Sequence, residues 1–418
     1  MATQIELLPV ELSHAIFEHV TAYPSGSWDE HEIPIHRPDL VRAPYQIAAV
    51  CKSWRALALG APQLWTYIDI PPEQTRYIDR RTDLNLVRSS PMPLIVVATI
   101  SGYNAKIATG VLDKVLVHAR RWRRFRFHAE RRVDVGPEWS AFGTAMPLVE
   151  EIVITTHSRR LMTSATVVLP ASPRLQRFAC SAFLATTPTP WAKLNYLVIN
   201  LRRLSVQYQL WNTLAFAVSL RELHLFFDYL DGMHQPVAHP DGEIALPHLE
   251  LLGIYGHSPV EISGWAQSWV CPKLHTIVAS TYGCYALGTF FAHLAKHIRI
   301  LHIRHEPGSR ISYRDAEAVL QLTELQELHL HGDMLVYDKL WLRSSQQLPS
   351  VAFWQELRTA VEAGTSLQKM RFLTAHGNIL LGGEELEHLQ VLMRVLAENA
   401  TARNDAFTAD CSDIMSPS

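Results

Sequence analysis

The chain has 418 residues, of which 48% are hydrophobic and 19% are charged, and its formal net charge at pH 7 is −2. This length allows about two or three domains, and the composition is sufficient for a large hydrophobic core. A nearly neutral chain lacks the broad positive field that draws proteins to nucleic acids or to anionic membranes, so we expect neither as a partner.

The cysteines and the N-terminal residues indicate an intracellular protein. The cysteines are odd in number, scattered and never spaced as CxxC, which favours reduced thiols over a disulfide framework or a zinc site. The N-terminus lacks the basic start and apolar run of a signal peptide. The most apolar window, residues 93–100, is far shorter than the ~18 residues of a membrane-spanning helix. We therefore expect a cytoplasmic or nuclear location. The cysteines are Cys51, Cys180, Cys271, Cys284 and Cys411.

A first amphipathic helix is predicted at the N-terminus. Pro9 suits the first turn of a helix, and Glu11 complements the helix dipole. Residues 21–43 are rich in proline and charge, a composition typical of a loop. The apolar residues that recur at helical spacing on one face are Leu8, Leu12, Ile16 and Val20.

A second helix is predicted from about Pro44 to Gly60. Gly60 ends this helix, and Pro62 prevents its continuation. Cys51 lies within its apolar stripe, where we interpret it as a buried structural thiol. Two short helices cannot bury much surface by themselves, so they must pack against the rest of the chain or against a partner. The broad apolar face contains Ile47, Val50, Cys51, Trp54, Leu57 and Ala58.

Residues 6–67 resemble an F-box. The resemblance rests on the Leu-Pro-x-Glu-Leu start, the Ile-Phe pair that follows, the Val-Cys-Lys-x-Trp-Arg core and a trailing Leu-Trp. Family members usually join the two helical parts with a few residues, whereas residues 21–43 intervene here; similar insertions occur in F-box-like proteins expanded in fungi. The resemblance implies docking onto the small adaptor that links F-box proteins to a cullin scaffold in an SCF-type ubiquitin ligase. By position, the adaptor-binding residues would be Leu8, Pro9, Leu12, Ile16, Phe17, Val50, Cys51, Trp54 and Leu57.

Residues 71–119 connect the N-terminal domain to the remaining chain. A helix is predicted before a strand at Leu94–Ile100, and a second helix is predicted over residues 105–119. This segment is interpreted as an irregular first repeat.

Beyond residue 120, three apolar residues recur with the spacing i, i+3, i+5. Most gaps between copies lie near the period of about 20–29 residues that leucine-rich repeats have. The alternation within each copy predicts a strand, and helical stretches stand before several copies. The last copy is assigned as Leu367-Met370-Phe372. The copies begin at residues 122, 149, 175, 194, 220, 249, 274, 298, 325 and 367.

The predicted fold is therefore α/β. Residues 1–70 form a small all-helical, F-box-like domain with an inserted loop at residues 21–43. Residues 120–400 form an irregular leucine-rich-repeat solenoid, with parallel strands on its concave face and helices on the other. A helix from Glu384 is expected to close its C-terminal end, and residues 401–418 are expected to be a disordered tail.

Two clusters invite a chemical interpretation. His329 and His331 fall on one face of a strand near Asp333, and together they are the best metal-like group in the sequence. We interpret them as a solvent-facing strand pair, because one edge of ligands rarely closes a metal site. The basic run from Arg120 to Arg126 could bind RNA or phosphate. We favour arginines on a solvated rim around a repeat core, and we expect no metal and no cofactor.

We found no nucleotide-binding or catalytic motif in the sequence, and we expect no enzymatic activity. The leading hypothesis is a substrate-recognition subunit that docks an adaptor and a cullin and holds an unknown protein substrate on its repeats. The alternative is a repeat scaffold whose F-box-like segment is only an N-terminal cap. An insertion near residues 337–349 offers Tyr337 and Trp341 as partner anchors.

Overall fold

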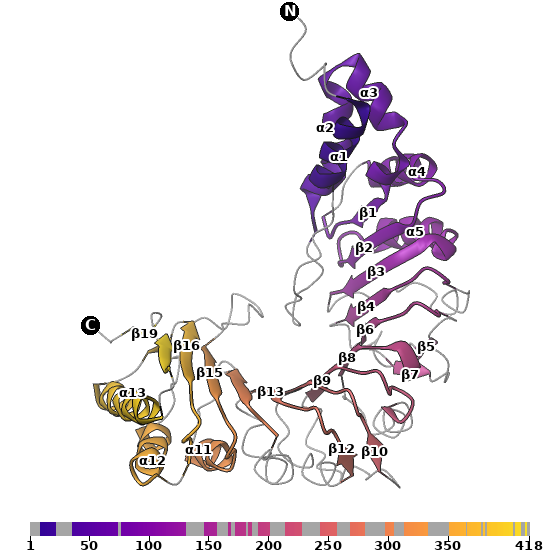
Figure 1. Ribbon diagram of the computed structural model, residues 1–418. Coiled ribbons are helices and arrows are strands. Elements are labelled where there is room, and N and C mark those ends of the chain that lie inside the picture. The colour runs from indigo at the N-terminus through magenta and orange to yellow at the C-terminus, as the bar shows by residue number, and fades with distance from the viewer. Residues whose placement is uncertain are drawn as a thin grey trace, which may run out of the picture. The chain divides into compact units, whose positions relative to one another are not determined.

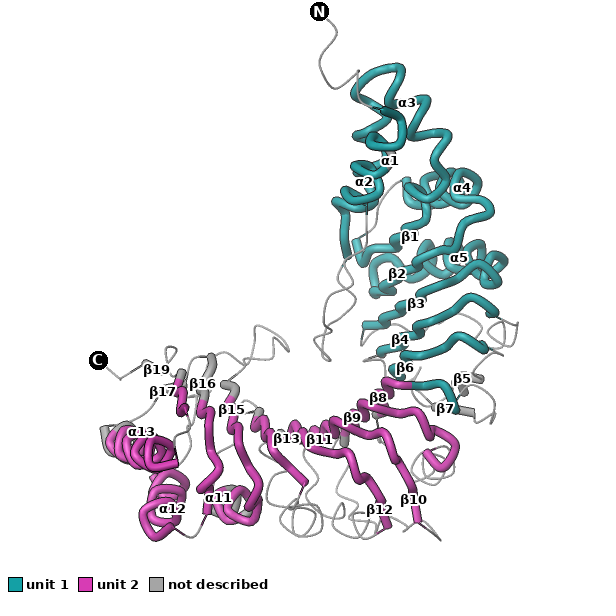
Figure 2. The backbone as a smooth tube through the Cα atoms, viewed as in Figure 1, with its two compact units in different colours: residues 1–194 teal, residues 195–418 magenta. Residues whose placement is uncertain are grey.

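In a computed structural model of the chain, two compact units are present, Met1–Leu194 and Asn195–Ser418 (Figure 2). Each unit is α/β and is built on parallel strands, as the sequence predicts. No helix in the described part of the chain is long and apolar enough to cross a membrane. The structure describes residues 9–21, 36–73, 77–130, 146–156, 166–168, 172–180, 183–185, 191–200, 214–227, 243–256, 268–280, 297–304, 313–332, 351–364, 366–377, 379–380, 383–403, 406–410 and 414–415.

The first unit opens with a helical segment, which Figure 1 draws in indigo. It comprises α1 (Val10–Thr21), α2 (Pro38–Val50), α3 (Lys52–Leu59) and the short 3-10 helix η2 (Pro62–Trp65). Their buried side chains share one core, which explains why helices this short are stable only together. The buried members of that core are Phe17, Ile47, Ala58, Ala61, Leu64 and Trp65.

The prediction of one helix from Pro44 to Gly60 is wrong, because the helix is interrupted at Cys51. The backbone of Cys51 is extended, with φ −156° and ψ 175°. Its Sγ accepts a hydrogen bond from the backbone N–H of Trp54 at 3.4 Å, so the thiol caps the start of α3. The end at Gly60 is confirmed, since its N–H donates to the carbonyl of Ala56.

The predicted loop over residues 21–43 is also too long. Helix α2 begins at Pro38, where a proline is tolerated in the first turn, and it includes Pro44. The early part of α2 is helical because Leu40 and Val41 are buried against the first strands of the sheet. Proline content therefore predicted a loop where tertiary packing holds a helix.

The sheet of the first unit begins earlier than predicted. Strand β1 (Tyr67–Ile70) directly follows η2, so the boundary set at residue 70 falls at the end of a sheet strand. The strand order is β1-β2-β3-β4-β6, and all four of these pairings are parallel. The predicted helix, strand and helix of the connecting segment are confirmed. The elements are β2 (Leu94–Ile100), β3 (Trp122–Ala129), β4 (Glu151–Thr156), β6 (Arg177–Cys180), α4 (Ile78–Arg88), α5 (Ala105–Leu116), the 3-10 helices η3 (Ala119–Arg121) and η5 (Trp191–Lys193), and the short pair β5 (Thr166–Val168) and β7 (Phe183–Ala185).

The second unit continues the same construction with strand order β8-β9-β11-β13-β14-β15-β16-β18. Helices α11, α12 and α13 pack in succession beside β15 and β16 (Figure 1). The strands are β8 (Tyr196–Asn200), β9 (Glu222–Phe227), β11 (Leu251–Gly256), β13 (Thr276–Ser280), β14 (Ile300–Arg304), β15 (Glu327–Gly332), β16 (Phe372–Gly377) and β18 (Thr408–Asp410). The helices are α11 (Tyr313–Leu320), α12 (Val351–Glu362) and α13 (Gly383–Ala402), and two short pairs are β10 (Ile244–Ala245) with β12 (Trp269–Val270) and β17 (Ile379–Leu380) with β19 (Ile414–Met415).

The recurring apolar positions occupy equivalent places in neighbouring strands. Leu223, Leu252 and Ile277, for example, follow one another in register across β9, β11 and β13, and all three are buried. A further buried position lies three residues before the first apolar residue of most copies, and its carbonyl accepts a hydrogen bond from the backbone N–H of that residue. This turn recurs at Met146–Val149, Ser172–Leu175, Trp191–Leu194, Ala217–Leu220, Leu246–Leu249, Cys271–Leu274, Leu322–Leu325 and Leu367–Met370.

The last copy was assigned three residues too early. Leu373, rather than Met370, lies opposite Leu328, and Phe372 is 39% exposed. The correct copy starts at Met370, because Leu367 occupies the turn position. The expected helix from Glu384 is confirmed as α13, whereas the expectation of a disordered tail is wrong for Thr408–Asp410, which pairs with β16.

Candidate functional site

The exposed face of α1 is the clearest candidate for a binding surface. Leu12, Ile16 and Val20 recur every fourth residue and are 52%, 47% and 51% exposed. Residues at this spacing lie one above the other on a helix, so they form a continuous apolar strip that we call the α1 stripe. A helix in a monomer normally turns such a strip toward its own core. The α1 stripe faces outward instead.

The neighbouring face of α1 explains this orientation. Phe17 is 1% exposed, and its ring meets the ring of Trp54 edge-on at 5.0 Å between centroids. Trp54 in turn packs against the core that contains Trp65, whose indole N–H donates to the carbonyl of Ala58 at 2.8 Å. Because these aromatic contacts fix the rotation of α1, the stripe cannot turn inward without opening the core.

The structure separates the sequence-predicted adaptor-binding residues into two groups. Pro9, Leu12, Ile16 and Val50 are exposed, and they can meet a partner directly. The second group lies inside or along the helical core: Phe17 is buried, while Cys51, Trp54 and Leu57 are half-buried. Leu8 lies outside the described residues, as do the proposed partner anchors Tyr337 and Trp341 and the third member of the metal-like group, Asp333.

The helical segment is fixed to the start of the sheet. Leu40 and Val41 of α2 pack with Tyr67 of β1 and Val97 of β2 in one buried cluster. The guanidinium of Arg88 in α4 lies 4.4 Å from the ring centroid of Trp65, a cation–π contact. The Tyr45 hydroxyl donates to Asn85 Oδ1 at 2.7 Å. These contacts hold the helical segment that carries the α1 stripe against α4 and the first strands of the sheet.

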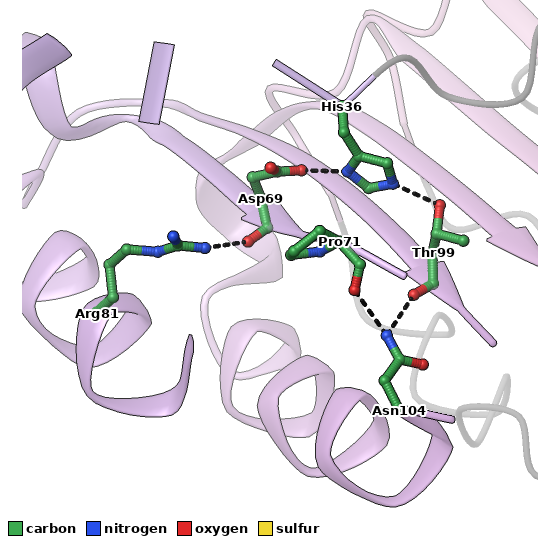
Figure 3. Close-up of polar contacts among 6 residues, drawn as sticks. All are labelled: His36, Asp69, Pro71, Arg81, Thr99 and Asn104. Carbon is green, nitrogen blue, oxygen red and sulfur yellow. Dashed lines mark hydrogen bonds and ion pairs between the residues drawn. The ribbon is translucent and has the colours of Figure 1, made fainter. Parts of the chain in front are cut away.

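A polar network joins His36, which lies two residues before α2, to two strands (Figure 3). His36 Nδ1 lies 2.6 Å from Asp69 Oδ1 in β1, and Nε2 lies 2.7 Å from Thr99 Oγ1 in β2. One tautomer of the imidazole satisfies both contacts, because Nδ1–H donates to the carboxylate and Nε2 accepts a hydrogen bond from the Thr99 hydroxyl. Around them, Arg81 donates to the carbonyl of Asp69, and Asn104 donates to the carbonyls of Pro71 and Thr99.

This hydroxyl–imidazole–carboxylate chain has the connectivity that activates a nucleophile in hydrolases. Here Thr99 is only 2% exposed, so its hydroxyl is not presented to a substrate. The geometry supports a structural role, in which His36 ties the start of α2 to β1 and β2. No local pattern in the sequence indicates these contacts, because the partners of His36 lie 33 and 63 residues away in the chain.

The basic run is a solvated rim only in part, since Arg120 and Arg123 are exposed. Arg126 is buried and pairs with Glu151 at 2.8 Å, and Arg123 pairs with Glu150 at 2.9 Å. Arg121 donates to backbone carbonyls of Leu86 and Met92, and burial lowers the pKa of its guanidinium. Arg123 and Arg126 link β3 to the start of β4, and Arg121 links η3 to α4 and to the turn before β2. These structural contacts weaken the RNA- or phosphate-binding interpretation.

The thiol of Cys271 is enclosed. Burial raises the pKa of the Cys271 thiol to about 12, so it is protonated and unreactive at neutral pH.

Neither a family model nor a curated protein matches this chain. The candidate site therefore rests on geometry, and the α1 stripe is its best-defined part.

Proposed function

We propose that the chain is the substrate-recognition subunit of an SCF-type cullin ubiquitin ligase. In this proposal, α1 to α3 form an F-box that docks the adaptor, and the parallel strands form a leucine-rich-repeat solenoid that holds a protein substrate. The observation that carries the proposal is the α1 stripe, which is held outward by the packing of Phe17 on Trp54.

The energetics of the stripe suit a docking surface. Full burial of a Val, Leu or Ile side chain stabilises by about 1.5–3 kcal/mol, so covering the exposed half of each side chain contributes roughly 1 kcal/mol. Val50 at the end of α2 and Leu59 at the end of α3 are exposed as well. A partner that covered these residues would gain a substantial part of the free energy of a specific interface.

The proposed activity is positioning rather than catalysis by this chain. A ligase scaffold places a bound substrate next to a recruited conjugating enzyme and so raises the effective concentration of the reacting groups. The recurring buried turn and strand support the repeat architecture, because units of this kind bury their apolar residues only against their neighbours.

Affinity purification of the tagged full-length chain tests this proposal. Leu12→Asp combined with Ile16→Asp places two carboxylates on the α1 stripe and should abolish co-purification of adaptor and cullin. The matched control is Tyr103→Asp with Val117→Asp, at residues that are 88% and 81% exposed outside α1 to α3. The control should retain both partners; retention by the stripe variant as well would overturn the proposed interface.

A second candidate is a repeat scaffold in which the helical segment only caps the sheet. The observation that favours it is the packing of Leu40 and Val41 on Tyr67 and Val97, together with the bonds of His36. Both candidates predict that removing the cap destabilises the first unit, so stability does not separate them. Adaptor binding by the wild-type chain separates the two candidates, because a helical segment that only caps the sheet should bind no adaptor.

A further inference from the structure

Three neighbouring strands of the second unit bring four histidines to one face of the sheet. His302 of β14 is in register with His329 of β15, and His331 of β15 is in register with His376 of β16. Positions two residues apart in a strand belong to the same face. The sequence showed one strand with two histidines, and the register adds one from each adjacent strand.

The spacing of these positions suits a metal ion. Neighbouring strands lie about 4.8 Å apart, and two residues span about 6.6 Å along a strand. Three imidazoles at such corners can converge on one ion at the Zn–N distance of about 2.0–2.1 Å, and three histidines form a sufficient zinc-binding set. Ligands from the edge of one strand rarely enclose a metal ion, which spoke against a site in the sequence. Two histidines on one strand and a third on the neighbouring strand are not subject to this objection.

The described side chains on this face are accessible and close. The rings of His302 and His329 are half-buried and stacked, with 4.4 Å between centroids and 13° between planes. His329 Nε2 lies 3.2 Å from Glu327 Oε2, a carboxylate that can orient a metal-bound imidazole. Of the four histidines, these two are the ones whose side chains the structure describes, and no three ligating side chains converge among those it describes.

We propose that His329, His331 and His376 bind one divalent transition-metal ion, with zinc as the ion tested. Imidazole nitrogens suit zinc, copper and nickel better than calcium or magnesium. The set on the β16 side is preferred over the one containing His302, because Arg304 lies in register with His331 on β14 and its positive charge opposes a cation there. Thr374 of β16 is the uncharged residue in register with His329.

The bound ion would cross-link β15 to β16. These strands are adjacent in the sheet, but the pair of ligands in β15 and the single ligand in β16 come from parts of the chain that are distant in sequence. A cross-link between distant segments restricts the unfolded chain, so metal binding should raise the melting temperature of the protein. The inference does not rest on the proposed docking function, since zinc binding is measured without any partner.

The test is a zinc titration of the full-length, chelator-stripped protein against a chromophoric competitor. We expect one Zn²⁺ per wild-type chain. His331→Gln and His376→Gln should each weaken binding by about tenfold or more, because loss of even an outer partner of a metal ligand costs that much. Both should also lose the zinc-dependent rise in melting temperature. Arg304→Gln should tighten binding, a gain that a misfolded variant cannot give.

His297→Gln is the matched control, since His297 is exposed and lies before β14, outside the cluster. It should bind zinc as the wild type does. The proposal is overturned if wild type binds no more zinc than His331→Gln, or if the His297→Gln control loses as much affinity as the cluster variants. The latter outcome would mean adventitious binding by surface histidines.

Discussion

At the residue scale, Phe17 and Leu12 have opposite roles although they lie on the same helix. Phe17→Ala should destabilise the first unit by about 3–5 kcal/mol, because it leaves a cavity beside Trp54 in a closely packed core. Leu12→Ala should change the free energy of unfolding by about 0.5 kcal/mol or less, because Leu12 is exposed. Urea denaturation of both variants measures this difference, and equal effects would contradict the assigned burial.

Gly253 is a position where only glycine fits. It lies in β11 beside His224 of β9, and a Cβ atom there would collide with His224 Nδ1 and come within 2.7 Å of the Tyr255 ring. His224 is fully buried and contacts the Tyr255 hydroxyl at 3.2 Å, so neither ring can move cheaply. Gly253→Ala should therefore cost about 1–3 kcal/mol, the usual penalty of overpacking.

Thermal unfolding measures that cost, with Gly110→Ala as the control. A Cβ at Gly110 meets no atom within 4 Å, and the residue lies in α5, so alanine should be neutral or stabilising there. A neutral Gly253→Ala would show that the rings over β11 are loosely packed.

At the element scale, His36 fastens α2 to the sheet. His36→Ala removes a partner from the Asp69 carboxylate, whose side chain is buried, and should destabilise the protein by about 1–3 kcal/mol. Thr99→Val, which keeps the shape of the side chain and removes only the hydroxyl contact, should cost less. Chemical denaturation of both variants gives the comparison, and a larger loss for Thr99→Val would contradict the central place of His36.

Apolar periodicity predicted some of the helices and strands and missed others. Apolar spacing located most of the longer strands from Trp122 onward, since each presents the same buried pattern to its neighbours. It shifted the copy in β16 by three residues and did not predict β18. It missed β1 because four residues carry too little alternation, and it missed the break at Cys51 because the thiol cap replaces a turn signal. The resemblance to an F-box, and not the apolar spacing, assigned residues of both α1 and α3 to one docking surface, in which packing turns Phe17 and Trp54 toward each other.

The candidate site could be predicted only in part, because the sequence does not show how its helices and strands pack. Helical spacing identified Leu12 and Ile16 but could not distinguish a strip that faces outward from one that faces a core. The contacts of His36 and the register of His331 with His376 depend on long-range pairing, which no local pattern encodes.

At the scale of the whole molecule, the helical segment and the first strands should fold as one unit. Deleting residues 1–66 would uncover Tyr67 and Val97, which Leu40 and Val41 now cover, and would remove Trp65 from beneath Arg88. We expect a fragment starting at residue 67 to aggregate or to melt well below the full-length chain. Differential scanning calorimetry measures this, and an unchanged transition would show that the segment is an independent domain.

Docking of the adaptor on the α1 stripe is tested by titrating the purified adaptor into the purified full-length chain. The wild type and Tyr103→Asp with Val117→Asp should show saturable one-to-one binding. Leu12→Asp with Ile16→Asp should bind at least about 100-fold more weakly, because each substitution loses roughly 1 kcal/mol of apolar burial and also places a carboxylate in the interface. Equal affinity of the stripe variant and the wild type, at equal melting temperatures, would overturn the proposed docking.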